Sequence, residues 1–132
     1  MTRLNGRLEQ LPGLTAQYVR PDAERVYYSN NLILLDEAKA GISREACVKA
    51  LQAEGVQASA YSWSLLHNYP IFHEAKWWHH LPAQPGKLPG CDQANRSCTA
   101  LPYFTREAPE LVDQYVKAFE KVWAHRSALA KG

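Results

Sequence analysis

Residues 26–61 carry the pattern that decides the fold class: VYYSNNLILLDEAKAGISREACVKALQAEGVQASAY. The first ten of them are rich in β-branched, aromatic and aliphatic side chains and predict a strand. A helix follows, because Ser43 is a suitable N-cap, Glu45 lies in the first turn and Gly55 comes just after the last turn. Residues 56–61 alternate in character, which predicts a second strand.

The segments on either side add helices and one further strand. Residues 1–13 predict a short linker-type helix, since leucines recur at spacings of four and three before a Pro-Gly pair. Residues 91–127 predict a short helix over 91–98, a short strand within 99–104 and a long helix. Pro102 restricts that strand to a sheet edge, because proline has no N–H to donate. The long helix presents an apolar face made of Leu111, Tyr115, Phe119, Val122 and Trp123.

Residues 62–90 form a long aromatic loop in this interpretation. The loop holds three tryptophans, four of the five histidines and four prolines, and nothing in it is periodic for long. A helical turn is expected near residues 71–76. Loops of this length in compact domains are functional or are packed on something. The order of elements predicts one α+β domain over residues 1–132, with a small sheet of two to four short strands covered by helices.

Composition excludes several classes of protein. The 132 residues are 46% hydrophobic, enough for one core, and the net charge of +2 gives no reason to expect a nucleic-acid partner. The longest apolar run, residues 32–35, is too short to span a membrane, and the first 13 residues show no signal peptide. Three cysteines cannot form a disulfide framework. We therefore expect a cytoplasmic protein.

The residues alone indicate no reaction. His73, Glu74, His79 and His80 lack the spacing of a zinc motif, so we expect no metal site. Cys91 and Cys98 are interpreted as small buried side chains. The aromatic residues between positions 61 and 78 are compatible either with packing inside the domain or with a docking surface.

The order and spacing of the segments resemble the C-terminal part of the DegT/DnrJ/EryC1/StrS family, the pyridoxal-phosphate-dependent sugar aminotransferases. The resemblance is carried by five stretches: RLNGRLEQLPGL (3–14), VYYSNNLILLD (26–36), GISREACVKALQAEGVQASAYSWSLLHNYPIF (41–72), CDQANRSCTALPYF (91–104) and ELVDQYVKAFEKVW (110–123). It implies the small C-terminal domain of a fold-type I transferase.

The resemblance also implies what the chain lacks. In the family, the Schiff-base lysine and most contacts to pyridoxal phosphate belong to a large N-terminal domain, and no segment here resembles it. We therefore expect no catalytic residue, no cofactor-binding residue and no bound cofactor in this chain. Tyr61 and His67 match the stretch that faces the substrate sugar, and Trp63 lies between them; the usual proline there is replaced by Ser64 or Leu65. Arg44 matches a family arginine and is otherwise interpreted as a surface charge.

Two hypotheses follow. In the first, the chain is a detached aminotransferase small domain, either a fragment or a subunit, inactive alone or acting with a partner chain. Residues 61–78 would then dock on a large domain or on a second copy. In the second, it is a free-standing binding module for a sugar nucleotide or another small ligand, with Tyr61, Trp63, His67 and Trp78 lining the pocket.

Overall fold

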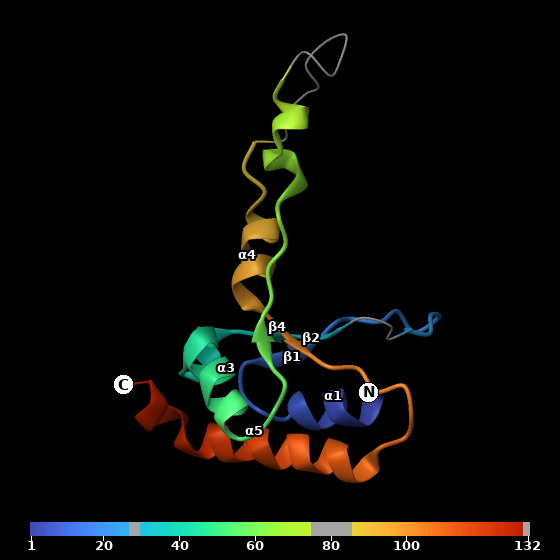
Figure 1. Cartoon of the computed structure of the whole chain (residues 1–132), viewed down its shortest axis with the longest axis vertical. Coiled ribbons are helices and arrows are strands. Elements are labelled where there is room, and N and C mark those ends of the chain that lie inside the picture. The colour runs from blue at the N-terminus through green and yellow to red at the C-terminus, as the bar shows by residue number, and fades with distance from the viewer. Residues whose placement is uncertain (27–29, 75–85, 131–132) are drawn as a thin grey trace.

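The computed structural model describes residues 1–26, 30–74 and 86–130 (Figure 1). Four strands form one antiparallel sheet in the order β1-β2-β4-β3. They are β1 (Leu14–Ala16), β2 (Asn31–Leu35), β3 (Ser59–Ala60) and β4 (Cys98–Leu101). The helices are α1 (Thr2–Leu8), α2 (Glu37–Ala40), α3 (Arg44–Ala53), α4 (Pro89–Ser97) and α5 (Pro109–Leu129), with 3-10 turns η1 (Leu66–Asn68) and η2 (Pro70–Phe72). The predicted α+β class is confirmed.

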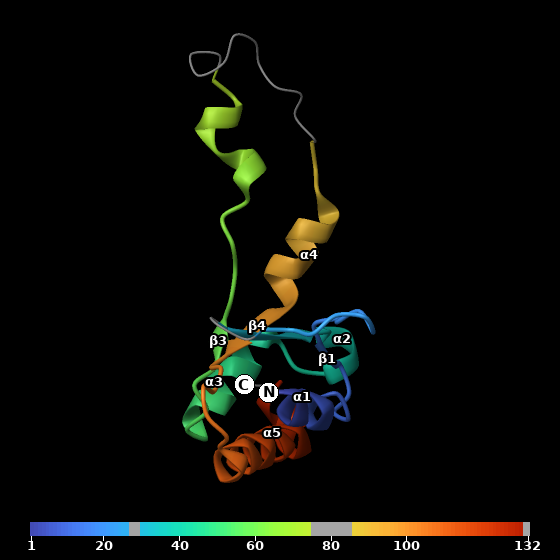
Figure 2. The same cartoon turned by 90° about the vertical axis from the view of Figure 1, so that its right-hand side faces the viewer.

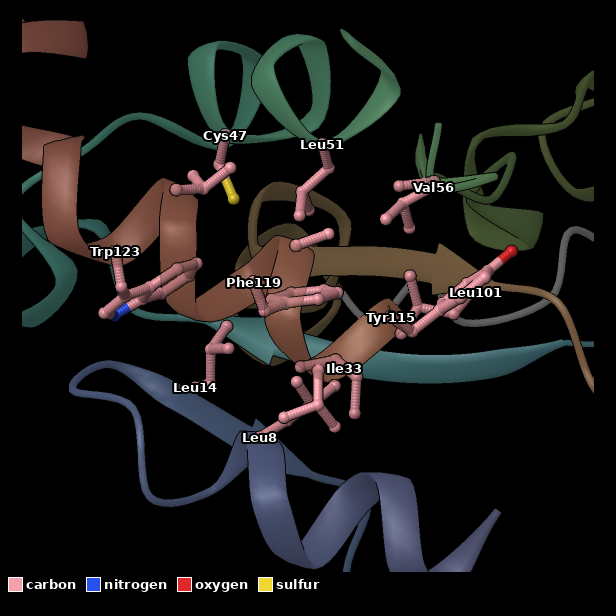
Figure 3. Close-up of a cluster of buried hydrophobic side chains, with 14 of the residues drawn as sticks. Leu8, Leu14, Ile33, Cys47, Leu51, Val56, Leu101, Tyr115, Phe119 and Trp123 are labelled. Carbon is pink, nitrogen blue, oxygen red and sulfur yellow. The ribbon is translucent and has the colours of Figure 1, made fainter. Parts of the chain in front are cut away.

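The core lies between one face of the sheet and the three helices α1, α3 and α5 (Figures 1 and 2). Alternate residues of a strand point to the same face, and Ile33, Leu35 and Leu101 point toward the helices. Figure 3 shows how side chains from α1, α3 and the sheet meet those of α5. Phe119 is 1% exposed at the centre of this cluster.

Helix α3 begins and ends where the sequence predicts. The Ser43 hydroxyl accepts a hydrogen bond from the Ala46 N–H at 3.2 Å, which satisfies one free donor of the first turn. Gly55 follows the helix with a φ of 85°, a conformation that a side chain disfavours. These two residues set the length of the helix that packs against α5.

Strand β4 lies inside the sheet, so its predicted place at an edge is wrong. It pairs with β2 on one side and with β3 on the other. The strand ends at Leu101, so the missing N–H of Pro102 falls just outside the ladder and costs nothing. The sequence also gave no sign of β1, and the first helix ends at Leu8, before Leu11.

The buried face of α5 differs from the predicted one in its first turn. Leu111 is 38% exposed, while Val112 and Val116 are buried. The buried positions of α5 are 112, 115, 116, 118, 119, 122 and 123, at the helical spacings of three and four, and Leu111 lies in the first turn at the edge of this stripe. The rest of the predicted face is confirmed.

An arm projects from the sheet on the side opposite the core helices (Figure 2). We define the arm as residues 61–74, its first limb, together with residues 86–97. The first limb includes η1 and η2, and the second part includes α4. The helical turn expected at 71–76 is observed earlier, as η2. The described part of the predicted long loop is thus an extension beyond the sheet.

Phe119→Ala is expected to lower the free energy of unfolding by about 3–5 kcal/mol, because it empties the centre of the core. Leu111→Ala on the same helix should cost no more than about 1 kcal/mol, since this side chain is partly in water. Urea unfolding followed by circular dichroism measures both. Equal losses would contradict the assignment of the buried face of α5.

Candidate functional site

The face of the sheet that carries the arm is called here the outer face. Leu32, Leu34, Cys98 and Ala100 alternate with the core residues of β2 and β4 and lie opposite one another in register. Two hollows lie over this face, one beside Tyr61 and Trp63 and one beside α4. The candidate site is therefore at the base of the arm.

The first hollow, the aromatic pocket, has a volume of about 150 Å³. Tyr61 and Trp63 line it with their ring centroids 4.8 Å apart in an edge-to-face arrangement. Arg25 lines it too and donates a hydrogen bond to the side-chain oxygen of Gln17. The remaining lining residues are Val26, Asn30 and Leu32. A cavity of this size has room for about one ring.

His67 does not line the aromatic pocket. It lies farther along the arm in η1, and its carbonyl is bonded to the His73 Nε2 at 2.8 Å. The structure therefore brings together Tyr61 and Trp63 but leaves His67 apart from them. Trp78 lies outside the described residues, so its predicted place in the pocket stays a prediction.

Asn95 on α4 holds the backbone of Trp63. Its side-chain oxygen accepts the Trp63 N–H and its side-chain nitrogen donates to the Trp63 carbonyl, both at 2.8 Å. One amide group thus satisfies both backbone groups of a pocket residue. Sequence reasoning missed Asn95. The available signal was a polar residue within a helix, where asparagine is a poor helix former unless its side chain has another partner.

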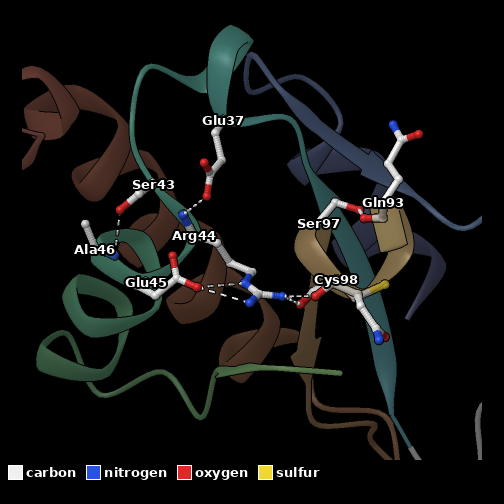
Figure 4. Close-up of polar contacts among 9 residues, drawn as sticks. Glu37, Ser43, Arg44, Glu45, Ala46, Gln93, Ser97 and Cys98 are labelled. Carbon is white, nitrogen blue, oxygen red and sulfur yellow. Dashed lines mark hydrogen bonds and ion pairs between the residues drawn. The ribbon is translucent and has the colours of Figure 1, made fainter. Parts of the chain in front are cut away.

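Arg44 links α3 to the end of α4 (Figure 4). Its guanidinium donates to the carbonyls of Asn95 at 2.5 Å and Cys98 at 3.4 Å, and it pairs with the Glu45 carboxylate at 3.0 Å. The side chain is only 14% exposed. The predicted surface charge is therefore wrong, because the guanidinium lies against the carbonyl of Asn95 in the last turn of α4, where carbonyls have no partner within the helix.

The second hollow is a polar groove of about 810 Å³ between α4, the start of α3 and the outer face. Its lining includes four carboxylates, of Asp36, Glu37, Glu45 and Asp92, against the guanidiniums of Arg44 and Arg96. Its own backbone N–H and then Arg44 lower the pKa of the Glu45 carboxyl, and a hydrogen bond from the Lys39 N–H lowers the pKa of Asp36. Both stay charged at neutral pH, so the groove is a poor site for an anion.

The described lysines do not form a cofactor site. A Schiff base to pyridoxal phosphate needs a lysine amine inside a pocket that also holds the ring and phosphate. Lys39, Lys49, Lys87, Lys117 and Lys121 are all exposed, and none lines either hollow. Residues 1–26, 30–74 and 86–130 therefore do not fit this cofactor by themselves.

The cysteines differ from one another in exposure. Cys91 is exposed on α4, so its predicted burial is wrong, whereas Cys98 is buried as predicted and Cys47 is buried in the core. All three are free thiols. Burial raises the pKa of Cys47 to about 12 and also raises the pKa of Cys98.

Neither a metal cluster nor a membrane-spanning helix is found in the described parts of the chain. There, no three metal-ligating side chains of His, Cys, Asp or Glu lie together. His79 and His80 lie outside the described residues, so the expected lack of a metal site stays a prediction. No helix in those parts is long and apolar enough to cross a bilayer.

Apolar side chains are exposed along the first limb of the arm. Between residues 61 and 74 the structure leaves four large ones in water: Trp63 (42% exposed), Leu66 (64%), Tyr69 (41%) and Ile71 (43%). They extend from the aromatic pocket through η1 to η2. The part of the predicted docking surface that is described thus has the exposure that docking requires.

Three solved structures share the fold of this chain. They are the aminotransferase TlmJ from Streptoalloteichus hindustanus (21% identity, TM-score 0.62), a DegT DnrJ EryC1 StrS aminotransferase from Brucella abortus (19%, 0.63) and DesI in the presence of its TDP-sugar product (20%, 0.69). The alignments cover 97%, 91% and 98% of this chain but only 30%, 28% and 31% of those proteins. No curated protein matches the sequence.

The sequence establishes the family to which the chain belongs. The sequence model of the DegT/DnrJ/EryC1/StrS aminotransferase family matches residues 1–120. The chain belongs to this family and spans about a third of the length of the aminotransferases that it resembles.

We expect one of the three thiols to react quickly with a thiol reagent in the folded protein. Cys91 is in water, while burial keeps the Cys47 and Cys98 thiols protonated and out of reach. Reaction with a disulfide reagent, followed by mass mapping, should label Cys91 alone, and all three cysteines in denaturant. Fast labelling of Cys47 or Cys98 without denaturant would contradict the fold.

Proposed function

We propose that this family member is the small domain of a pyridoxal-phosphate-dependent sugar aminotransferase and works with a large domain that holds the cofactor. The observation that carries the proposal is the unequal coverage, nearly all of this chain against less than a third of each aminotransferase. The exposure of every described lysine supports it. Pyridoxal phosphate, when bound, supplies the electron sink for amino transfer. The residues of this chain position the substrate.

The aromatic pocket is the proposed place of substrate contact. Sugar rings have apolar C–H faces that pack on aromatic rings, which Tyr61 and Trp63 provide. Arg25 adds a positive charge beside them, as suits a sugar that carries phosphates. The polar groove has the opposite balance of charge, which directs an anionic substrate to the aromatic pocket.

The size of the pocket supports the need for a second domain. Pockets that bury a whole drug-sized ligand have volumes of about 300–1,000 Å³, whereas the aromatic pocket has about 150 Å³. It holds one ring of a sugar nucleotide and leaves the rest uncovered. In the proposal, the large domain covers that remainder and packs on the exposed apolar side chains of the arm, with a second copy of the chain as the other candidate partner.

A free-standing binding module is the second candidate function. The observation in its favour is that the aromatic pocket is complete enough within this chain to pair Tyr61 with Trp63 and to bring Arg25 to the same hollow. Its ligand would be a sugar nucleotide or another small molecule with a ring.

We expect pyridoxal phosphate to form no stoichiometric adduct with the chain alone, because the described lysines are in water. Titration followed by absorbance at the aldimine band, then borohydride reduction and mass mapping, tests this. Scattered, substoichiometric labelling of exposed lysines is the expected result. One lysine labelled to one equivalent would mean that the chain builds its own cofactor site, and the small-domain proposal would fail.

Titration with a panel of nucleotide sugars separates the two candidate functions. A small domain that needs its partner should show no saturable change in tryptophan fluorescence. A binding module should show saturable quenching that Trp63→Ala abolishes. Tyr69→Ala is the matched control, since Tyr69 is an exposed aromatic residue of the same arm outside the pocket lining. Saturable quenching that Tyr69→Ala leaves intact would favour the module.

A further inference from the structure

We propose that Asn95 and Arg44 are positioning residues that fix the direction of the arm, and the orientation of Trp63, before any ligand or partner binds. The role of Trp63 in substrate contact rests on the proposed function. The positioning itself rests on contacts within this chain.

The Asn95 side chain supplies hydrogen bonds to residue 63 at the point where the backbone pairing of β3 with β4 ends. Ser59 pairs with Ala100 and Ala60 with Thr99, and the Tyr61 N–H donates to the Cys98 carbonyl at 3.0 Å. Two residues farther on, the antiparallel partner of Trp63 would fall within α4, where the backbone is helical and bonds to itself. The Asn95 side chain supplies the donor and the acceptor instead. The first limb thus stays aligned with α4 beyond the end of the sheet.

Arg44 holds the backbone of Asn95, the residue whose side chain holds Trp63. The carbonyls in the last turn of a helix have no partner within the helix, and that of Asn95 accepts from the guanidinium. The carbonyl of Cys98, the first residue of β4, accepts from the same group at 3.4 Å. Glu45 accepts from the guanidinium at 3.0 and 3.2 Å and keeps it in that orientation. Because α3 packs in the core through Cys47 and Leu51, the end of α4 is tied to the core.

The resulting series of contacts runs from the core to the aromatic pocket. Helix α3 carries Arg44, Arg44 holds the carbonyl of Asn95, and the Asn95 side chain holds Trp63. Among the described residues, the two bonds from Asn95 are the hydrogen bonds that join residues 61–65 to α4. Their loss would free the first limb while leaving the core contacts of α1, α3 and α5 in place.

Amide hydrogen exchange of the full chain, measured by NMR without ligand, tests the proposal. The Trp63 N–H should be protected in the native protein, and Asn95→Ala should lower that protection roughly tenfold, the scale of one lost hydrogen bond. The protection of the Ile33 amide in the core strand should not change. Asn95→Asp keeps the acceptor for the Trp63 N–H and should retain part of the protection.

Arg44→Ala is the sharper variant, because Arg44 does not bond to Trp63. It should also lower the protection of the Trp63 amide. Arg44→Lys replaces the planar guanidinium with a single ammonium group, so its protection at Trp63 should lie between that of Arg44→Ala and that of the native protein. Asn68→Ala, a change to an exposed asparagine of the same arm, should leave Trp63 unaffected.

Two results would overturn the proposal. One is equal exchange of the Trp63 amide in the native protein and Asn95→Ala. The other is an equal loss of protection at Trp63 and Ile33, which would assign to Asn95 a part in global stability rather than in positioning. Since no ligand is present, the positioning can hold while sugar-nucleotide binding fails, and the reverse, so the two proposals fail separately.

Discussion

The paired hydrogen bonds between the Asn95 side chain and the Trp63 backbone are the constraint on which the arm depends. The chain leaves the sheet after β3 and returns to it at β4, two neighbouring strands of which only a few residues are paired. So short a ladder does not by itself define how the departing segments lie. The side-chain amide adds one more pair of bonds beyond the ladder, and Arg44 fastens the same residue to a helix of the core. The aromatic pocket, which Tyr61 and Trp63 line, therefore lies just beyond the last paired residues of β3.

The two faces of the sheet differ in what they carry: one faces the core, and the other faces the candidate site. One face packs under α1, α3 and α5 and contributes to the core cluster of buried apolar side chains. The other holds two hollows and the arm, on which Trp63, Leu66, Tyr69 and Ile71 are exposed to water. Burial of apolar surface is the main source of folding free energy, and the exposed aromatic residues on the arm contribute little to it. This division agrees with the proposal that the domain works beside a large domain, as does the match to about a third of each aminotransferase.

Sequence reasoning was accurate where local chemistry decides the outcome. Ser43 caps α3 and Gly55 ends it because cap and turn residues act on their own backbone. It failed where distant residues decide. The inner position of β4 depends on partners from two other strands, and the partial burial of Arg44 depends on a helix end about fifty positions away. Asn95 gave only one weak signal, a polar residue within a helix, since its role exists only once residues 61–65 lie beside α4. The structure brings Tyr61 and Trp63 together, while His67 lies farther along the arm in η1, a separation that depends on how the arm folds.

A distance distribution between the arm and the core measures whether the arm has one fixed direction. Cys91 is an exposed native thiol on α4, and Lys117→Cys would place a second exposed thiol on α5, while Cys47 and Cys98 stay buried. Spin labels on these two positions, measured by pulsed electron spin resonance, report how firmly the arm is held. If Asn95 and Arg44 hold the arm, the chain alone gives one narrow distribution. A broad or multiple distribution would mean that Asn95 and Arg44 do not fix the arm, and that its direction is set by something outside this chain.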